Sequence, residues 1–108
     1  MIDNTTYLKD IIENANLALE FVKGMKFEQF ERDIKTSYAC ARSIEIIGEA
    51  SKKLEDSIKA NYPEIPWKKV AGMRDIMIHN YSGVNTRKVW ETVQNEIPQL
   101  LKCLEKKI

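Results

Sequence analysis

Apolar side chains recur along this chain at spacings of three and four residues, and no stretch alternates apolar and polar positions as a half-buried strand does. The first run predicts a helix from about Thr5 to Lys23, with Asp3 and Asn4 as capping residues and Gly24 as its stop. We expect a short turn at Phe27–Phe30 to fold over the core. The apolar face of the helix consists of Leu8, Ile11, Ile12, Ala15, Ala18, Leu19 and Val22.

A second run predicts a helix from about Asp33 to Lys59. Gly48 lies inside it and costs about 1 kcal/mol relative to alanine, so we expect another helix or a ligand to come close there. The segment Tyr62–Pro66 then breaks the helical pattern. The apolar positions of the helix are Ile34, Tyr38, Ala41, Ile44, Ile47, Leu54 and Ile58.

Two further helices complete the pattern. Pro66 suits the first position of a third helix, which is expected to end near Tyr81. A turn at Ser82–Val84 follows, and Asn85 can cap a fourth helix that extends to Ile108. The apolar phase of this helix continues across Pro98, which predicts a kink rather than a new element. Four amphipathic helices with short connections predict an all-α, antiparallel four-helix bundle.

Length and charge narrow the function classes. A chain of 108 residues, with 31% charged and 44% apolar residues, predicts a single globular domain over residues 1–108. The net charge of +1 argues against indiscriminate attraction of nucleic acid, so RNA would have to bind at a local site. Cys40 and Cys103 lack the spacing of a zinc site or a disulfide framework. The chain shows no targeting pattern and no apolar run of about 18 residues, so we expect a cytoplasmic protein.

The richest chemistry lies in one short segment, where Arg74, Asp75, His79 and Tyr81 form the pattern Arg-x4-His-x-Tyr with a carboxylate after the arginine. His79 is the only histidine of the chain. The planar fork of an arginine can donate two parallel hydrogen bonds to a phosphate. An imidazole exchanges protons near neutrality, because its unperturbed pKa is about 6.5. Together these groups suit cleavage of a phosphodiester without a metal ion.

Helix geometry constrains how this motif works. Arg74 and Tyr81 share a helix face within about 20°, and Asp75 could accept a hydrogen bond from His79 four residues on. Arg74 and His79, in contrast, are separated by about 140° around the helix axis. Either the helix loosens at His79, or two copies of the segment meet across a two-fold axis. The second option is favoured because symmetric dimers are the commonest oligomers.

The motif residues also have simpler, purely structural interpretations. On spacing alone, the motif is more often an ion-paired surface cluster, with Asp75 and His79 as a structural pair and Tyr81 closing a helix end. An arginine, a histidine and a tyrosine often occur by chance within nine residues of a helix. Their spacing is therefore a weak signal without its surroundings.

Other charged and aromatic residues admit two readings as well. Arg42, Glu45 and Glu49 share a helix face and are interpreted as an ion-pair set, with a position facing the cleft as the alternative. Trp67 and Trp90 are assigned to the core or a dimer interface rather than to base stacking.

The surroundings of the motif resemble the HEPN-domain proteins of the HepT-like (DUF86) group. The likeness is densest around the motif itself, and it covers most of the chain. It runs through Tyr7–Ile11, Glu45–Ala50, Ile65–Trp67, Ala71–Asp75, His79, Tyr81, Gly83–Val84, Val89–Asn95 and Ile97–Pro98. The sequence departs from the common pattern at Asn80, Ser82 and Asn85, where glycine, an aromatic residue and aspartate are frequent.

The resemblance implies a helical bundle that forms a symmetric homodimer and a ribonuclease that needs no metal or other cofactor. By this analogy Arg74 and His79 are catalytic, and Asp75 fills the polar position after the arginine. Tyr81 corresponds to the tyrosine that receives AMP from an MNT-type nucleotidyltransferase, the antitoxin that silences the toxin. RNA would be the substrate, whereas DNA lacks the 2′-hydroxyl that such cleavage uses.

Two functional hypotheses of different classes remain. In the first, the chain is the toxin of a type II or AMPylation-controlled toxin–antitoxin system and cleaves RNA at a dimer cleft. In the second, it is a non-catalytic HEPN module that binds a nucleotide or RNA, docks the transferase and is modified by it. A purely structural bundle is a third reading. Neither membrane nor DNA is an expected partner.

Overall fold

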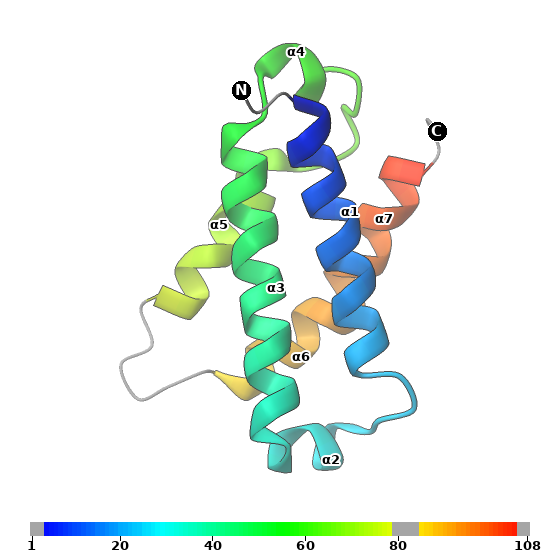
Figure 1. Cartoon of the computed structure of the whole chain (residues 1–108), viewed down its shortest axis with the longest axis vertical. Coiled ribbons are helices and arrows are strands. Elements are labelled where there is room, and N and C mark those ends of the chain that lie inside the picture. Colours follow the sequence, from blue (N-terminus) through cyan, green and yellow to red (C-terminus); the bar gives the residue numbers. More distant parts are fainter. Residues whose placement is uncertain (1–3, 79–84, 106–108) are drawn as a thin grey trace.

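The structure, a computed structural model, describes residues 4–78 and 85–105, and these residues form helices joined by short connections without any strand (Figure 1). The all-α prediction is thereby confirmed for this part of the chain. The helices, in order, are α1 (Asn4–Phe21), α2 (Phe27–Arg32), α3 (Ile34–Lys53), α4 (Asp56–Lys59), α5 (Trp67–Ile78), α6 (Thr86–Glu91), the π-helical segment η1 (Thr92–Glu96) and α7 (Ile97–Glu105).

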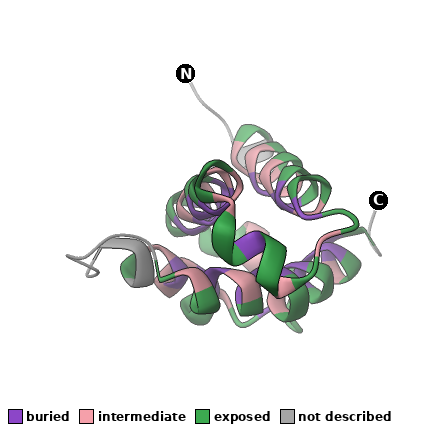
Figure 2. Ribbon diagram, turned by 90° about the horizontal axis from the view of Figure 1, so that it is seen from below, coloured by how far each residue is buried: buried purple, intermediate pink, exposed green. Residues whose placement is uncertain are grey.

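Helix α3 lies at the centre of the packing. It runs antiparallel to α1 on one side and packs against α5 on the other, while α7 returns alongside α1 (Figure 1). In the view of Figure 2 the buried positions lie on the sides of the helices that face one another. None of the helices in the described ranges is both long and apolar enough to cross a bilayer.

Interlocking apolar side chains fill the interior. Phe30 of α2 is fully buried and covers one end of the bundle, where its ring lies 5.1 Å from that of Trp90. The expected turn is thus a short helix, and it folds over the core as predicted. Trp67 is half-buried, and its indole Nε1 donates to the Lys59 carbonyl at 3.2 Å. Both tryptophans are partly buried and pack against the core, one of the two places predicted for them.

Two predicted capping signals act as the sequence suggests. Asn85 caps α6, since its side chain accepts a hydrogen bond from the Lys88 N–H at 3.1 Å. Gly24 follows α1 with a φ of +77°, the left-handed conformation that a glycine stop provides. Asp33 stands just outside α3 as its N-cap, with Oδ1 3.0 Å from the Thr36 nitrogen. Helix α1 already includes Asn4, which is therefore not its cap.

The prediction of one helix from Asp33 to Lys59 is wrong. Helix α3 ends at Lys53, Leu54 adopts an extended conformation with ψ 139°, and α4 begins at Asp56. Leu54 is nevertheless buried. A break at this point keeps the apolar residues on the core side, so the apolar spacing alone does not distinguish one long helix from two.

Pro98 produces a different irregularity from the simple kink that was predicted. The helical run continues from α6 into α7, but the turn before the proline is π-helical, and the Ile97 N–H donates to the Thr92 carbonyl five residues back. A proline ring collides with the carbonyl four residues before it, here that of Gln94. The widened π turn, a known way of interrupting an α-helix, makes room for that ring.

Candidate active site

Helices α3 and α5 approach each other closely at Gly48. A Cβ placed on this residue would be 3.1 Å from the Ala71 carbonyl oxygen, from the Arg74 nitrogen and from the Arg74 Cβ. Because a hydrogen takes the place of that side chain, the backbone of α5 can lie almost against α3. The close approach expected at Gly48 is confirmed, and it occurs at the motif arginine.

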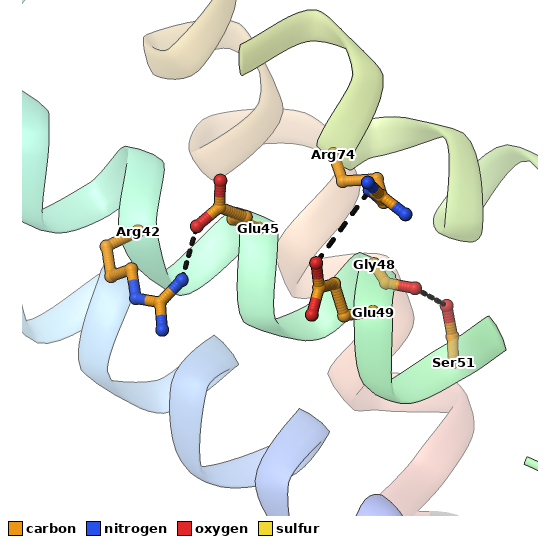
Figure 3. A network of polar contacts seen from close by, with 6 residues as sticks. All are labelled: Arg42, Glu45, Gly48, Glu49, Ser51 and Arg74. Atoms are coloured by element: carbon orange, nitrogen blue, oxygen red, sulfur yellow. Dashed lines mark hydrogen bonds and ion pairs between the residues drawn. The ribbon is translucent and has the colours of Figure 1, made fainter. Parts of the chain in front are cut away.

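Arg74 leaves α5 at this contact and extends over α3 (Figure 3). Its side chain is 27% exposed, but its Nε is buried and makes no hydrogen bond to any of the described residues. The nearest carboxylate oxygen is Oε1 of Glu49, at 4.0 Å from Nε. This separation is too long for a hydrogen bond but still within the range of an ion pair.

The energetics of this pair are unusual for a surface contact. Partly exposed ion pairs contribute only about 0–1 kcal/mol. A buried donor without a partner, in contrast, costs about 1–3 kcal/mol. The Nε of Arg74 is therefore incompletely satisfied, and a closer approach to Glu49 would give it a partner.

The ion-pair set predicted on α3 is only partly present. Arg42 does pair with Glu45, three residues on, as the spacing suggests. Glu49 instead faces Arg74 on the neighbouring helix (Figure 3). The sequence contains one signal that could have revealed this contact. Gly48 marks a close approach between helices, and a charged residue beside such a glycine is well placed to meet the approaching helix.

Arg74 and Asp75 are the two predicted site residues that the described ranges include. Asp75 is exposed on α5. His79 and Tyr81 lie outside the described residues, so the proposed Asp75–His79 hydrogen bond and the position of the AMP acceptor stay predictions.

A hollow of about 120 Å³ adjoins Glu49 on the side of α3 that faces α1. Its lining combines an aromatic ring, two carboxylates and an ammonium group. Lys53 Nζ lies 5.9 Å from the centre of the Tyr7 ring, across this hollow. The lining residues are Tyr7, Asp10, Ile46, Glu49, Ala50 and Lys53. Glu49 thus borders this hollow and also faces the motif arginine.

Outside the α3–α5 contact, the described residues include a buried thiol and a largely apolar cavity. Burial raises the pKa of the Cys40 thiol to about 12, which keeps it protonated and unreactive. A second cavity, of about 80 Å³ between α5 and α7, is lined mainly by apolar groups such as Val70 and Leu100. Among residues 4–78 and 85–105, no three histidine, cysteine or acidic side chains are grouped as metal ligands.

Similarity to known proteins points to one family. The family model described as ribonuclease HepT-like matches residues 11–106. A candidate RNase of Caldanaerobacter subterraneus subsp. tengcongensis is 47% identical over 96 residues, which cover 89% of this chain and 86% of the relative. The probable ribonuclease HepT of Thermococcus cleftensis is 48% identical over 100 residues, covering 93% and 91%. A candidate RNase of Methanocaldococcus jannaschii is 44% identical over 104 residues, covering 96% and 86%. No solved structure matches the chain.

Proposed function

Because this chain belongs to the HepT-like ribonuclease family, we propose that it is the toxin of a toxin–antitoxin pair and that it cleaves RNA without a metal ion. RNA cleavage follows from the family. The observation that best supports the site is Arg74, a guanidinium held at the α3–α5 contact with its side chain still 27% exposed. Such a group is suited to bind one phosphate of an RNA backbone.

The proposed reaction is an internal transfer of the phosphoryl group. His79 removes the proton of the 2′-hydroxyl, and the 2′ oxygen forms a bond to phosphorus. The bond to the 5′ oxygen breaks, and His79 of the partner subunit returns a proton to that leaving oxygen. A 2′,3′-cyclic phosphate and a free 5′-hydroxyl result. Acid–base help of this kind contributes roughly 10²–10⁴-fold.

Arg74 supplies the electrostatic part of the mechanism. Its guanidinium holds the phosphate and offsets the negative charge that grows on the phosphate oxygens in the transition state. A well-placed donor contributes on the order of 10²–10³-fold. Since Arg74 and His79 are about 140° apart on a straight helix, we propose that the arginine of one subunit acts with the histidine of the other.

Control of the toxin is assigned to Tyr81 and a partner nucleotidyltransferase. Tyr81 is seven residues from Arg74, so on a helix that continued to Tyr81 its hydroxyl would lie on the arginine's side. Addition of AMP would bring a phosphate that pairs with Arg74 and occupies the fork that RNA needs. The modification would therefore block cleavage without unfolding the bundle.

The test is cleavage of a short RNA by purified protein in excess EDTA, with a DNA strand of the same sequence as substrate control. Arg74→Ala is expected to lose about 10²–10³-fold and His79→Ala about 10²–10⁴-fold of the rate. Arg42→Ala removes the same charge from a residue that pairs with Glu45, and it should retain activity. Full activity of either motif variant would refute the assignment. RNA binding without any cleavage would favour the non-catalytic module instead.

A further inference from the structure

Glu49 is the carboxylate that the structure places beside the motif arginine. Gly48, the residue before it, allows the Arg74 backbone to lie 3.1 Å from where a Cβ would be. Glu49 extends from the next position of α3, and its Oε1 is 4.0 Å from Arg74 Nε (Figure 3). The pair Gly48–Glu49 therefore brings the arginine close to α3 and then meets its guanidinium with a negative charge.

The burial of Nε determines which part of Arg74 can meet a ligand. Nε is inaccessible to solvent, although the side chain as a whole is 27% exposed. A phosphate that arrives from solvent therefore meets the Nη groups and not Nε. Because the guanidinium is planar and rigid, a contact that fixes the position of Nε also fixes the direction in which the Nη groups point.

We propose that Glu49 is a positioning residue for Arg74: it draws Nε toward α3 and thereby sets the direction of the Nη groups that contact the RNA phosphate. This inference rests on the proposed function, in which Arg74 binds that phosphate. If Glu49 Oε1 and Arg74 Nε came about 1 Å closer, the present ion pair would become a hydrogen bond. We expect this approach to occur when RNA binds. Glu45, one turn earlier, is already committed to Arg42.

The charge of Glu49 gives this role a kinetic signature. A carboxylate near the guanidinium repels an anionic substrate, so it does not help RNA to bind. It helps only by holding the guanidinium in the geometry that the transition state needs. Loss of Glu49 should therefore lower kcat while KM stays unchanged or falls. A residue that contacted RNA directly would raise KM, and a merely structural residue would change thermal stability alone.

The experiment measures kcat and KM of the full chain on a short RNA. Glu49→Ala is expected to lower kcat about 10- to 100-fold without raising KM, since misplacement of a catalytic group by about 1 Å has effects of this size. Glu49→Gln keeps an acceptor oxygen and should fall between Glu49→Ala and wild type. Glu45→Gln is the matched control on the same helix and should leave both constants unchanged. If Glu49→Ala does not fold, Glu49→Gln carries the test.

A double variant separates this inference from the proposed function. If Glu49 acts through Arg74, Glu49→Ala causes no further loss in an Arg74→Ala background. A multiplied loss would show that Glu49 acts on the reaction by itself and would overturn the positioning role. A kcat within twofold of wild type in both Glu49 variants, with Arg74→Ala inactive, would overturn it too. Full activity of Arg74→Ala would instead refute the proposed function.

Discussion

Gly48→Ala tests whether the tight contact between α3 and α5 controls both stability and the site. The added Cβ would lie 3.1 Å from three atoms of α5, two of which belong to its backbone. Carbon atoms in a packed interior ordinarily stay about 3.5–4.0 Å apart. Helix α5 must therefore move away by a few tenths of an ångström, because backbone atoms cannot rotate aside as a side chain can.

Two opposing terms determine how much Gly48→Ala changes the free energy of unfolding. Replacing a helical glycine by alanine stabilises a helix by about 1 kcal/mol. Overpacking a close contact costs about 1–3 kcal/mol. For Gly48→Ala the sum lies between no change and a loss of about 2 kcal/mol. Gly72, on α5, is the matched control, because a Cβ there would meet no atom of the described residues within 4 Å. Gly72→Ala should thus gain about 1 kcal/mol.

Thermal unfolding followed by circular dichroism measures the difference. At roughly 4–8 °C for each kcal/mol, the Tm of Gly72→Ala should exceed that of Gly48→Ala by at least about 4 °C. Moving α5 also moves Arg74, so Gly48→Ala should lose RNA cleavage about tenfold while Gly72→Ala keeps it. If both variants raise the Tm equally, α5 does not press on α3 at this point and the reasoning fails.

Three other predictions concern control, assembly and acid stability. On co-expression with a partner nucleotidyltransferase, wild-type protein should gain one AMP by mass and Tyr81→Phe none; AMP on any of the other three tyrosines would contradict the control mechanism. Light scattering at micromolar concentration should show a dimer, and a monomer alone would refute the two-subunit site. Hydrogen bonds from Thr36 hold the pKa of Asp33 in the folded protein below its usual value of 3.8. The ionised Asp33 carboxylate therefore stabilises the folded state above pH 3.8, and this contribution is lost as the pH falls through the lowered pKa. The Tm of Asp33→Ala should fall less steeply in that acid range than the wild-type Tm, and parallel curves would exclude this role for the cap.

The features that sequence predicts well are those that depend on nearby residues. The helices follow from apolar spacing, because a helix must bury one face wherever it packs. Asn85 and Gly24 act within a few residues of their own positions, through a hydrogen bond to a neighbouring backbone and through a left-handed φ. Such signals need no knowledge of what lies across the core.

The errors arise where two backbone conformations satisfy the same pattern. Leu54 reaches the core from an extended conformation, as it would from a continued helix, so its spacing does not reveal the break. The basic residues Lys52 and Lys53 in the last turn of α3 are the available signal, since cations favour a helix C-terminus. At Pro98 the chemistry indicates an interruption but not its form, because a kink and a π turn both relieve the clash.

The site shows the same division between local and distant information. Arg74 stands out in the sequence because its spacing to His79 can be read along the chain. Its contact with Glu49 depends on how closely two helices approach, and that distance is set by the missing side chain of Gly48. The orientation of the guanidinium is therefore a property of the α3–α5 pair. Any change that separates these helices should impair the arginine even when the motif itself is intact, which is why Gly48→Ala and Glu49→Ala are expected to affect the same step.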